Sequence, residues 1–318
     1  MRDYERHLKR LMHTQFNLIG IAFLCLCAIG AAGHFFKDFI WLQYRDVIDI
    51  FAYGFIDNLY QIAVKFVQSF APFFLVSIVL KIKNTHIWSK PKISPLNQFA
   101  LIFLGLAVYL ILSAATSGLI TLATSKNVGV ASIPSSLMSN FLEVQWTYLI
   151  YVILLCPLVE EYIYRGVVLQ CFARYGNRFA VVASSFLFAL SFGRLQTALP
   201  GFFLGMFLSV IALYYQSIRP VLWIRIGVAI LSVAEMLIPL SQVWIFGVIC
   251  LVSYGVSLIF LFVNRYNRLV LKSDIDELLS IKMFLTSTLL MLSCAVMIAL
   301  TYSLPLRQWI EQMISKVV

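Results

Sequence analysis

Charged side chains are scarce in this sequence. Asp, Glu, Lys and Arg make up 12% of the 318 residues, whereas 61% are hydrophobic. Soluble globular proteins carry about a quarter charged residues, so this composition cannot cover a water-soluble surface. Four blocks contain no charged residue at all, namely 14–36, 66–80, 99–124 and 283–306. A helix needs about 20 apolar residues to cross the bilayer core, so the sequence predicts a membrane-spanning protein.

A disulfide framework and a nucleic-acid surface are also missing. All six cysteines lie inside apolar segments without a Cys-x-x-Cys pair, which is typical of small buried hydrophobes. The net charge is +10, but the basic residues occupy short loops and form no basic face interleaved with aromatics. We therefore expect the lipid bilayer as a partner and no nucleic acid.

The apolar pattern predicts an all-α fold, a polytopic bundle of transmembrane helices. Basic residues gather in the N-terminal tail and in the loop 81–92, and such loops face the cytoplasm. We therefore expect a cytoplasmic N-terminus and a multi-pass protein of a bacterial plasma membrane. The number of helices is about nine, or eight if the short segment 179–193 belongs to a re-entrant hairpin. The nine expected ranges are 14–34, 58–80, 98–124, 146–164, 179–193, 199–216, 220–240, 243–263 and 283–305.

Two outer segments are expected between these helices. The stretch 37–57 carries four aspartates among aromatic residues, which indicates an amphipathic helix lying on the membrane face. The stretch 125–145 is rich in Ser and Asn and predicts a polar outer loop.

Carboxylates and a guanidinium cluster at the inner end of the fourth expected helix. The sequence there reads Cys156-Pro-Leu-Val-Glu160-Glu161-Tyr-Ile-Tyr-Arg165-Gly166. Each charge in a bilayer costs at least about 2.5–3.5 kcal/mol, so such residues are paired or functional. Glu161 and Arg165 are four residues apart and can pair on one helix face. Glu160 points about 100° away, toward the bundle interior, where a half-desolvated carboxylate can act as a general base on water.

This motif, Glu-Glu-x-x-x-Arg-Gly, resembles the first motif of the CPBP family, the CAAX prenyl protease 2, bacteriocin-processing and lysostaphin-resistance protein A-like membrane peptidases. The run Ala183-Ser-Ser-Phe-Leu-Phe188 is similar to the family's second motif, Phe-x-x-x-His. Gln216-Ser-Ile-Arg-Pro220 is similar to the turn that precedes the third motif, His-x-x-x-Asn. The resemblance covers 146–240 and implies a CAAX-protease-like core there. Transmembrane helices in 1–145, with the outer amphipathic segment, and in 241–318 would flank this core.

The sequence departs from the family where histidines are expected. The second-motif histidine position holds Phe192, the third-motif histidine position holds Arg225, and the asparagine position holds Ala229. The resemblance implies that a glutamate activates water while the histidines and asparagine bind a metal or stabilise the oxyanion. Phenylalanine and alanine do neither, and arginine cannot ligate a metal as imidazole does. All four histidines of the chain precede the first motif. We therefore expect no metal or other cofactor; a divalent metal would be expected only in an active enzyme.

Two further charges fall inside an expected membrane helix. Arg225 and Glu235 are ten residues apart on it, nearly three turns, and cannot pair directly. We expect a partner for Arg225 on another helix, and Glu160 or Glu161 is the attractive choice. The motif carboxylates would then belong to a structural ion network. Gly201 and Gly205, four apart, would let two helices approach closely.

The leading hypothesis is a degenerate CPBP-family pseudopeptidase that binds or regulates a membrane or cell-envelope partner. The alternative is an active intramembrane endopeptidase with Glu160 as general base. There Glu161 and Arg165 would form the orienting pair and Arg225 would donate to the oxyanion. A transporter or channel is a third class, against which stands the lack of inverted repeats.

Overall fold

The computed structural model describes residues 2–44, 50–82, 88–91, 93–124, 149–192, 195–237, 248–249, 251–256 and 277–299. Every regular element in these residues is a helix, so the all-α prediction is confirmed for the part that the structure describes. The elements are α1 (Arg2–Tyr44), α2 (Ile50–Val79), α4 (Pro95–Thr124), η2 (Tyr151–Leu155), α6 (Cys156–Glu161), η3 (Tyr162–Val168), α7 (Leu169–Ala173), α8 (Asn177–Leu190), α9 (Leu195–Tyr215), α10 (Arg219–Leu237) and α12 (Glu277–Thr286). A further helix, Thr288–Ala299, follows α12.

Several helices are long and apolar enough to cross a bilayer. By length and composition there are 4 such helices among the described residues, or up to 5 if the bent pair at the C-terminal side is one span. They lie in α1, α2, α4 and α9. These helices agree with a helical membrane bundle. The expected total of about nine is not tested, because much of 238–276 lies outside the described residues.

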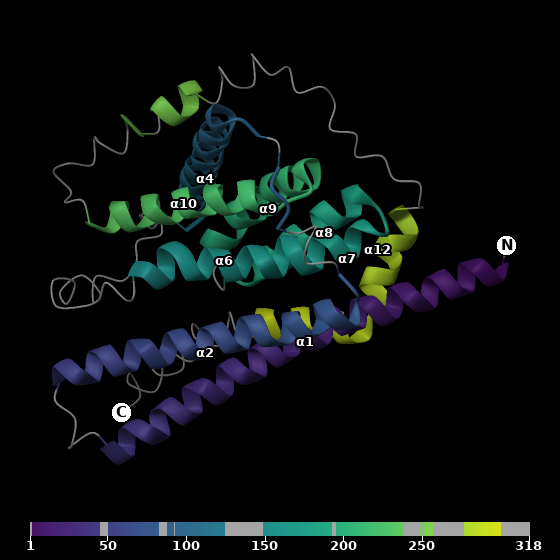
Figure 1. Ribbon diagram of the computed structural model, residues 1–318, viewed down its shortest axis with the longest axis horizontal. Coiled ribbons are helices and arrows are strands. Elements are labelled where there is room, and N and C mark those ends of the chain that lie inside the picture. Colours follow the sequence, from purple (N-terminus) through teal and green to yellow (C-terminus); the bar gives the residue numbers. More distant parts are fainter. Residues whose placement is uncertain are drawn as a thin grey trace.

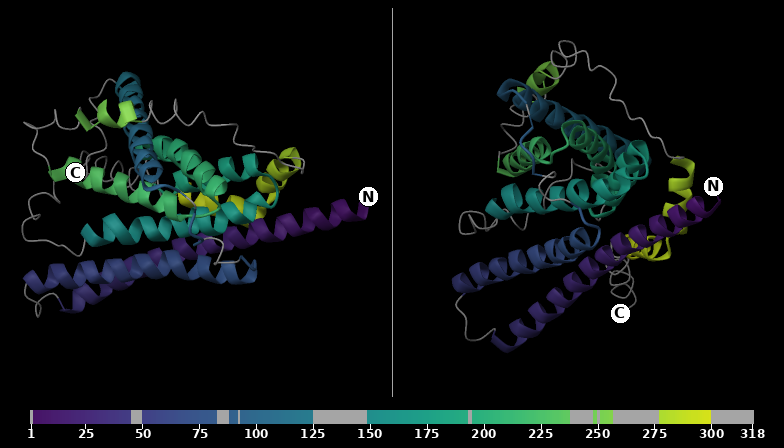
Figure 2. Two further views of the ribbon diagram at one scale, coloured as in Figure 1. Left: turned by 45° about the horizontal axis from the view of Figure 1, so that its top comes forward. Right: turned by 45° about the vertical axis from the view of Figure 1, so that its right-hand side comes forward.

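The helices are arranged in layers around the helix of residues 149–173, called the motif helix because it carries Glu160, Glu161 and Arg165 (Figure 1). The long helices α1 and α2 pack together on one side, and the motif helix and α8 follow them. Next come α9 and α10, and α4 crosses these two at a steep angle, as Figure 2 also shows from two further directions. The motif helix therefore lies in the middle of the bundle, between the α1–α2 pair and the pair formed by α9 and α10.

The outer segment 37–57 differs from the prediction. Its described residues continue α1 to Tyr44 and begin α2 at Ile50, so they do not form a separate surface helix. No glycine or proline occurs between residues 37 and 53, so the chain has no strong helix breaker there. At 1.5 Å per residue, the 43 residues of α1 are far longer than the bilayer core of about 30 Å. The expected loop 125–145 lies outside the described residues.

The expected C-terminal helix 283–305 is broken. Glu277–Thr286 and Thr288–Ala299 meet at an angle of 66°. Asn17 on α1 stabilises the break, because its Oδ1 accepts a hydrogen bond from the backbone N–H of Leu289 at 3.1 Å. A Cβ on Gly20, one turn further along α1, would lie 2.4 Å from the backbone nitrogen of Leu290. The bent segment therefore packs directly on the backbone of α1.

Aromatic rings hold one end of the bundle together. The ring of Phe16 on α1 lies 5.0 Å from Phe172, 5.8 Å from Phe179 and 6.4 Å from Phe284, measured between centroids. These four rings come from α1, α7, α8 and α12, and all are buried. Aromatic pairs at such distances contribute about 0.5–1.5 kcal/mol per pair beyond their burial. The cluster thus fixes the end of the motif helix relative to α8.

Candidate functional site

The motif helix runs without interruption from residue 149 to residue 173, but two segments of it are wound as π-helix. The α-helical turn α6 lies between two π-helical segments, η2 and η3. Pro157 lies inside this continuous helix just after η2, where its missing N–H removes one helical hydrogen bond. π-Helical turns are rare and are found frequently at functional sites. No pattern in the sequence indicated them.

Glu161 and Arg165 form the buried half of the site. The Nη1 of Arg165 donates to Oε1 of Glu161 at 3.2 Å, and neither side chain has any exposed surface. The predicted pairing is therefore confirmed. The Nη2 of Arg165 also donates to the backbone carbonyl of Gly205 at 3.2 Å. Because Gly205 lies on α9, this guanidinium ties the motif helix to a second helix.

Glu160 and Arg225 form the partly exposed half. The Nη2 of Arg225, on α10, donates to Oε2 of Glu160, and its Nε lies 3.5 Å from Oε1 of Glu161. The expectation that Arg225 meets the motif carboxylates is confirmed, and it meets both. The side chain of Glu160 is 26% exposed, against 11% for Arg225. The thiol of Cys156 donates to the other oxygen of Glu160 at 3.2 Å. Glu160 therefore faces the interior with both carboxylate oxygens accepting hydrogen bonds.

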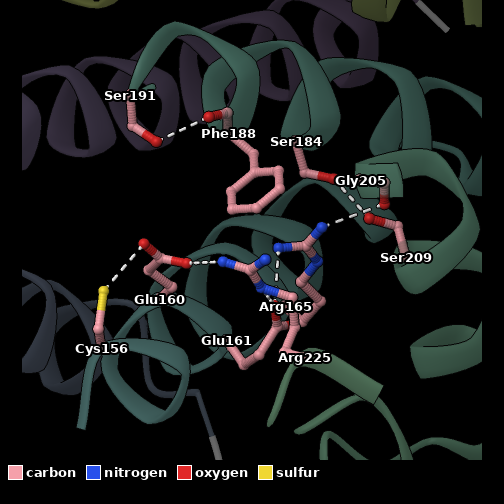
Figure 3. A network of polar contacts seen from close by, with 10 residues as sticks. All are labelled: Cys156, Glu160, Glu161, Arg165, Ser184, Phe188, Ser191, Gly205, Ser209 and Arg225. Atoms are coloured by element: carbon pink, nitrogen blue, oxygen red, sulfur yellow. Dashed lines mark hydrogen bonds and ion pairs between the residues drawn. The ribbon is translucent and has the colours of Figure 1, made fainter. Parts of the chain in front are cut away.

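Phe188 covers the two guanidinium groups. Its ring centroid lies 4.2 Å from Cζ of Arg165 and 5.4 Å from Cζ of Arg225, and the ring is fully buried. Figure 3 shows both guanidinium groups on the same side of this ring. A cation over an aromatic face is attracted by the ring quadrupole. The side chain that matches the phenylalanine of the second motif therefore contacts the charge network directly.

The other motif positions supply no ligand. Phe192 packs edge to face on Phe188, with centroids 4.9 Å apart, and a Cβ on Gly201 would lie 2.6 Å from its ring. Ala229 is half-buried on α10, one turn beyond Arg225. The side chain of Glu235 lies outside the described residues. In the part of the chain that is described, no three His, Cys, Asp or Glu side chains gather to hold a metal ion.

The expected close approach at the two glycines is confirmed. A Cβ on Gly205 would lie 3.1 Å from Phe188 and from Ser185, both on α8. Close by, the hydroxyls of Ser184 on α8 and Ser209 on α9 lie 3.3 Å apart. The glycine spacing of α9 thus brings α8 near enough for Phe188 to reach the guanidinium groups (Figure 3).

The network is balanced in charge and tightly cross-linked. Two carboxylates on the motif helix face two guanidinium groups, one on the same helix and one on α10. The sequence pattern did not predict three contacts of the network, which are those with the Cys156 thiol, the Gly205 carbonyl and the Phe188 ring. The four-residue spacing of Cys156 and Glu160 was available as a signal, but the carbonyl and the ring depend on how helices cross.

These observations define the class of protein, which is a helical membrane bundle with a paired ion network at its centre. Residues 142–231 match the family model of the type II CAAX prenyl endopeptidase Rce1-like proteins. This segment is therefore similar to an Rce1-like domain, which agrees with the resemblance to the CPBP family. No curated protein and no solved structure matches the chain.

Proposed function

We propose that this protein is a catalytically degenerate CPBP-family pseudopeptidase that binds or regulates a membrane or cell-envelope protein. The observation that carries the proposal is the ion pair between Arg225 and Glu160. Arg225 occupies the third-motif histidine position, and Glu160 is the carboxylate that would activate water. A guanidinium at this place compensates the charge of the presumed general base.

The surroundings of Glu160 support this proposal. A general base must lie within hydrogen-bond reach of a water molecule and accept its proton. Both oxygens of Glu160 already accept hydrogen bonds, one from Arg225 and one from Cys156. Phe192 and Ala229 offer no group that would bind a metal or an oxyanion. The proposed function therefore requires no metal or other cofactor.

The cross-links suit a binding role. The buried network joins the motif helix to α9 through Gly205 and to α10 through Arg225, while Phe188 brings in α8. Four helices are thus held in one register around the charges, and a rigid arrangement presents fixed surfaces to a partner. We place the protein in a bacterial plasma membrane, in line with its basic inner loops.

One observation favours the alternative, an active intramembrane endopeptidase. Glu160, Glu161 and Arg165 are all present, and Glu160 keeps 26% of its side-chain surface exposed. A substrate that displaced Arg225 would free the carboxylate. In that case Arg225 would donate to the oxyanion, and the Glu161–Arg165 pair would orient the site.

The test compares cells that carry the wild-type protein, a deletion, or Glu160→Gln at matched protein levels. The measurement is mass spectrometry of the N-termini of membrane proteins, together with a phenotype of the deletion. We expect Glu160→Gln to behave as wild type while the deletion alone has a phenotype. Uncleaved substrate that accumulates both in the deletion and in Glu160→Gln would establish the peptidase and refute the pseudopeptidase. Glu5→Gln, the same change at an exposed glutamate on α1, serves as the matched control.

A further inference from the structure

The helix α8 is too short to span a bilayer core. Its 14 residues measure about 21 Å at 1.5 Å per residue, against about 30 Å of hydrocarbon. Gly176, with a φ of 129°, makes the turn from α7 into α8, a conformation that favours glycine. Arg174 and Arg178 lie on either side of this turn. A short helix brings flanking charges close to the hydrocarbon boundary, where lipid headgroups adapt to them.

One face of α8 is left exposed by the part of the chain that the structure describes. Arg178, Val182 and Phe186 follow one another at intervals of four residues and so lie on one helix face. Arg178 is exposed, Val182 is 48% exposed and Phe186 is 41% exposed. The face therefore carries a cation at its beginning and an apolar strip along the next two turns.

Other basic residues are brought to the same end. Nη2 of Arg174 donates to the carbonyl of Leu80 at 3.0 Å, which places the exposed Lys81 beside the turn. The hydroxyl of Ser280 donates to the carbonyl of Tyr175 at 2.7 Å, which brings α12 and its exposed Lys282 to the turn as well. The views in Figures 1 and 2 agree that α12 lies beside the beginning of α8.

These cations are not neutralised by the described part of the chain. None of Lys81, Arg174, Arg178 and Lys282 forms an ion pair with a described carboxylate. The carboxylate of α12, Glu277, is the first residue of this helix and lies five positions before Lys282. An excess of positive charge thus remains around the turn, next to an exposed apolar strip.

We propose that this end of α8 binds a phospholipid with an anionic headgroup. The headgroup phosphate would accept hydrogen bonds from the guanidinium of Arg178, with Arg174, Lys81 and Lys282 adding attraction, and an acyl chain would lie along Val182 and Phe186. Guanidinium groups bind phosphate through two parallel hydrogen bonds. A phospholipid would contact both the cations and the apolar strip, whereas a free phosphate ion would contact the cations alone. The inference is independent of whether the Rce1-like segment cleaves peptides.

The experiment uses the purified full-length protein in detergent and native mass spectrometry with added phosphatidylglycerol or phosphatidylcholine. We expect the wild type to bind phosphatidylglycerol more tightly than phosphatidylcholine. Each cation near an anionic headgroup contributes about fivefold to the binding, so Arg178→Gln should weaken phosphatidylglycerol binding about fivefold. Arg178→Lys, which keeps the charge, should lose less. Lys65→Gln is the matched control, because Lys65 lies on α2 about 21 Å before its inner end.

A second set of measurements tests the proposed contact between an acyl chain and the apolar strip. Val182→Ser should weaken phosphatidylglycerol binding while leaving the charge of the site unchanged. If Arg178→Gln fails to fold, Val182→Ser tests the proposal in its place. Glycerol phosphate, a headgroup without chains, should not displace phosphatidylglycerol at equal concentration. Equal binding of the two lipids, or no change in Arg178→Gln, would overturn the proposal. Displacement by glycerol phosphate would reduce the site to an anion site without a lipid.

Discussion

Arg225 on α10 donates a hydrogen bond to Glu160 on α6 across 65 residues of sequence. The same guanidinium reaches Glu161 with its Nε, so one arginine serves both carboxylates of the motif. Charges inside a bilayer are retained where they are paired, and here the pair also joins two helices. Arg225 therefore supplies the counter-charge that the carboxylates need.

This pairing predicts an energetic coupling between Glu160 and Arg225. We expect Glu160→Gln and Arg225→Gln together to lower the free energy of unfolding by less than the sum of the single variants. Residues within one ion network are coupled by about 0.5–3 kcal/mol. The measurement is a double-mutant cycle on SDS-induced unfolding in mixed micelles. Glu160→Gln combined with Arg174→Gln, which lies at the far end of the motif helix, should be additive. A coupling of zero for the first pair would contradict the observed contact.

The buried half of the network should matter more to stability than the exposed half. Glu161→Gln leaves Arg165 without its carboxylate in a fully buried place, and such losses cost about 3–5 kcal/mol. Glu160→Gln should cost less, because Glu160 is 26% exposed and Arg225 retains Glu161 nearby. The free energies of unfolding of the two variants, measured under one set of conditions, give the comparison. Equal losses would show that burial does not set the strength of these pairs.

The sequence predicted those parts of the site that depend on local spacing or on the cost of charge. Glu161 and Arg165 pair because four residues make nearly one helical turn, and Arg225 needed a carboxylate because a lone intramembrane charge is costly. That Arg225 reaches both Glu160 and Glu161 was not predicted, because this depends on where α10 lies against the motif helix. The π-helical segments, the Gly205 carbonyl and the ring of Phe188 depend on the relative placement of helices, which residue types and their spacing do not encode.

For the fold, too, the sequence predicted what local composition determines and did not predict what contacts between distant segments determine. Apolar blocks predicted where the helices lie, because the bilayer requires about 20 such residues. They did not predict that α1 runs on to Tyr44, since aspartates and aromatics are compatible with a helix that leaves the membrane. They also gave no sign of the break at Ser287. That break depends on a hydrogen bond that the backbone N–H of Leu289 donates to Asn17 on α1, 272 positions away.

Phe188 should contribute to stability through the two guanidinium groups that it covers. Phe188→Leu keeps an apolar side chain but removes the aromatic face above Arg165 and Arg225. We expect it to lower the free energy of unfolding by about 1–3 kcal/mol, from lost cation–π attraction and lost packing. Phe186→Leu, two residues earlier and 41% exposed, should change it by no more than about 0.5 kcal/mol. Similar effects of the two variants would mean that the ring contacts with the arginines contribute nothing.

Gly20 should be intolerant of any side chain, because the bent C-terminal segment lies against it. In Gly20→Ala the new Cβ would lie 2.4 Å from the nitrogen of Leu290 and 2.5 Å from the carbonyl carbon of Leu289. Both atoms belong to the backbone, so no rotamer change relieves the overlap and the helices must separate. Such overpacking costs about 1–3 kcal/mol, and the separation would also weaken the hydrogen bond from Leu289 to Asn17.

Gly118 on α4 is the matched control for this prediction. A Cβ there meets nothing within 4 Å, and alanine is favoured over glycine inside a helix by about 0.5–1 kcal/mol. Gly118→Ala should therefore leave the free energy of unfolding unchanged or raise it, while Gly20→Ala lowers it. Thermal unfolding of both variants in the same detergent compares them. If Gly20→Ala were as stable as Gly118→Ala, the C-terminal segment would not rest on α1, and the cap from Asn17 would lose its role in the break at Ser287.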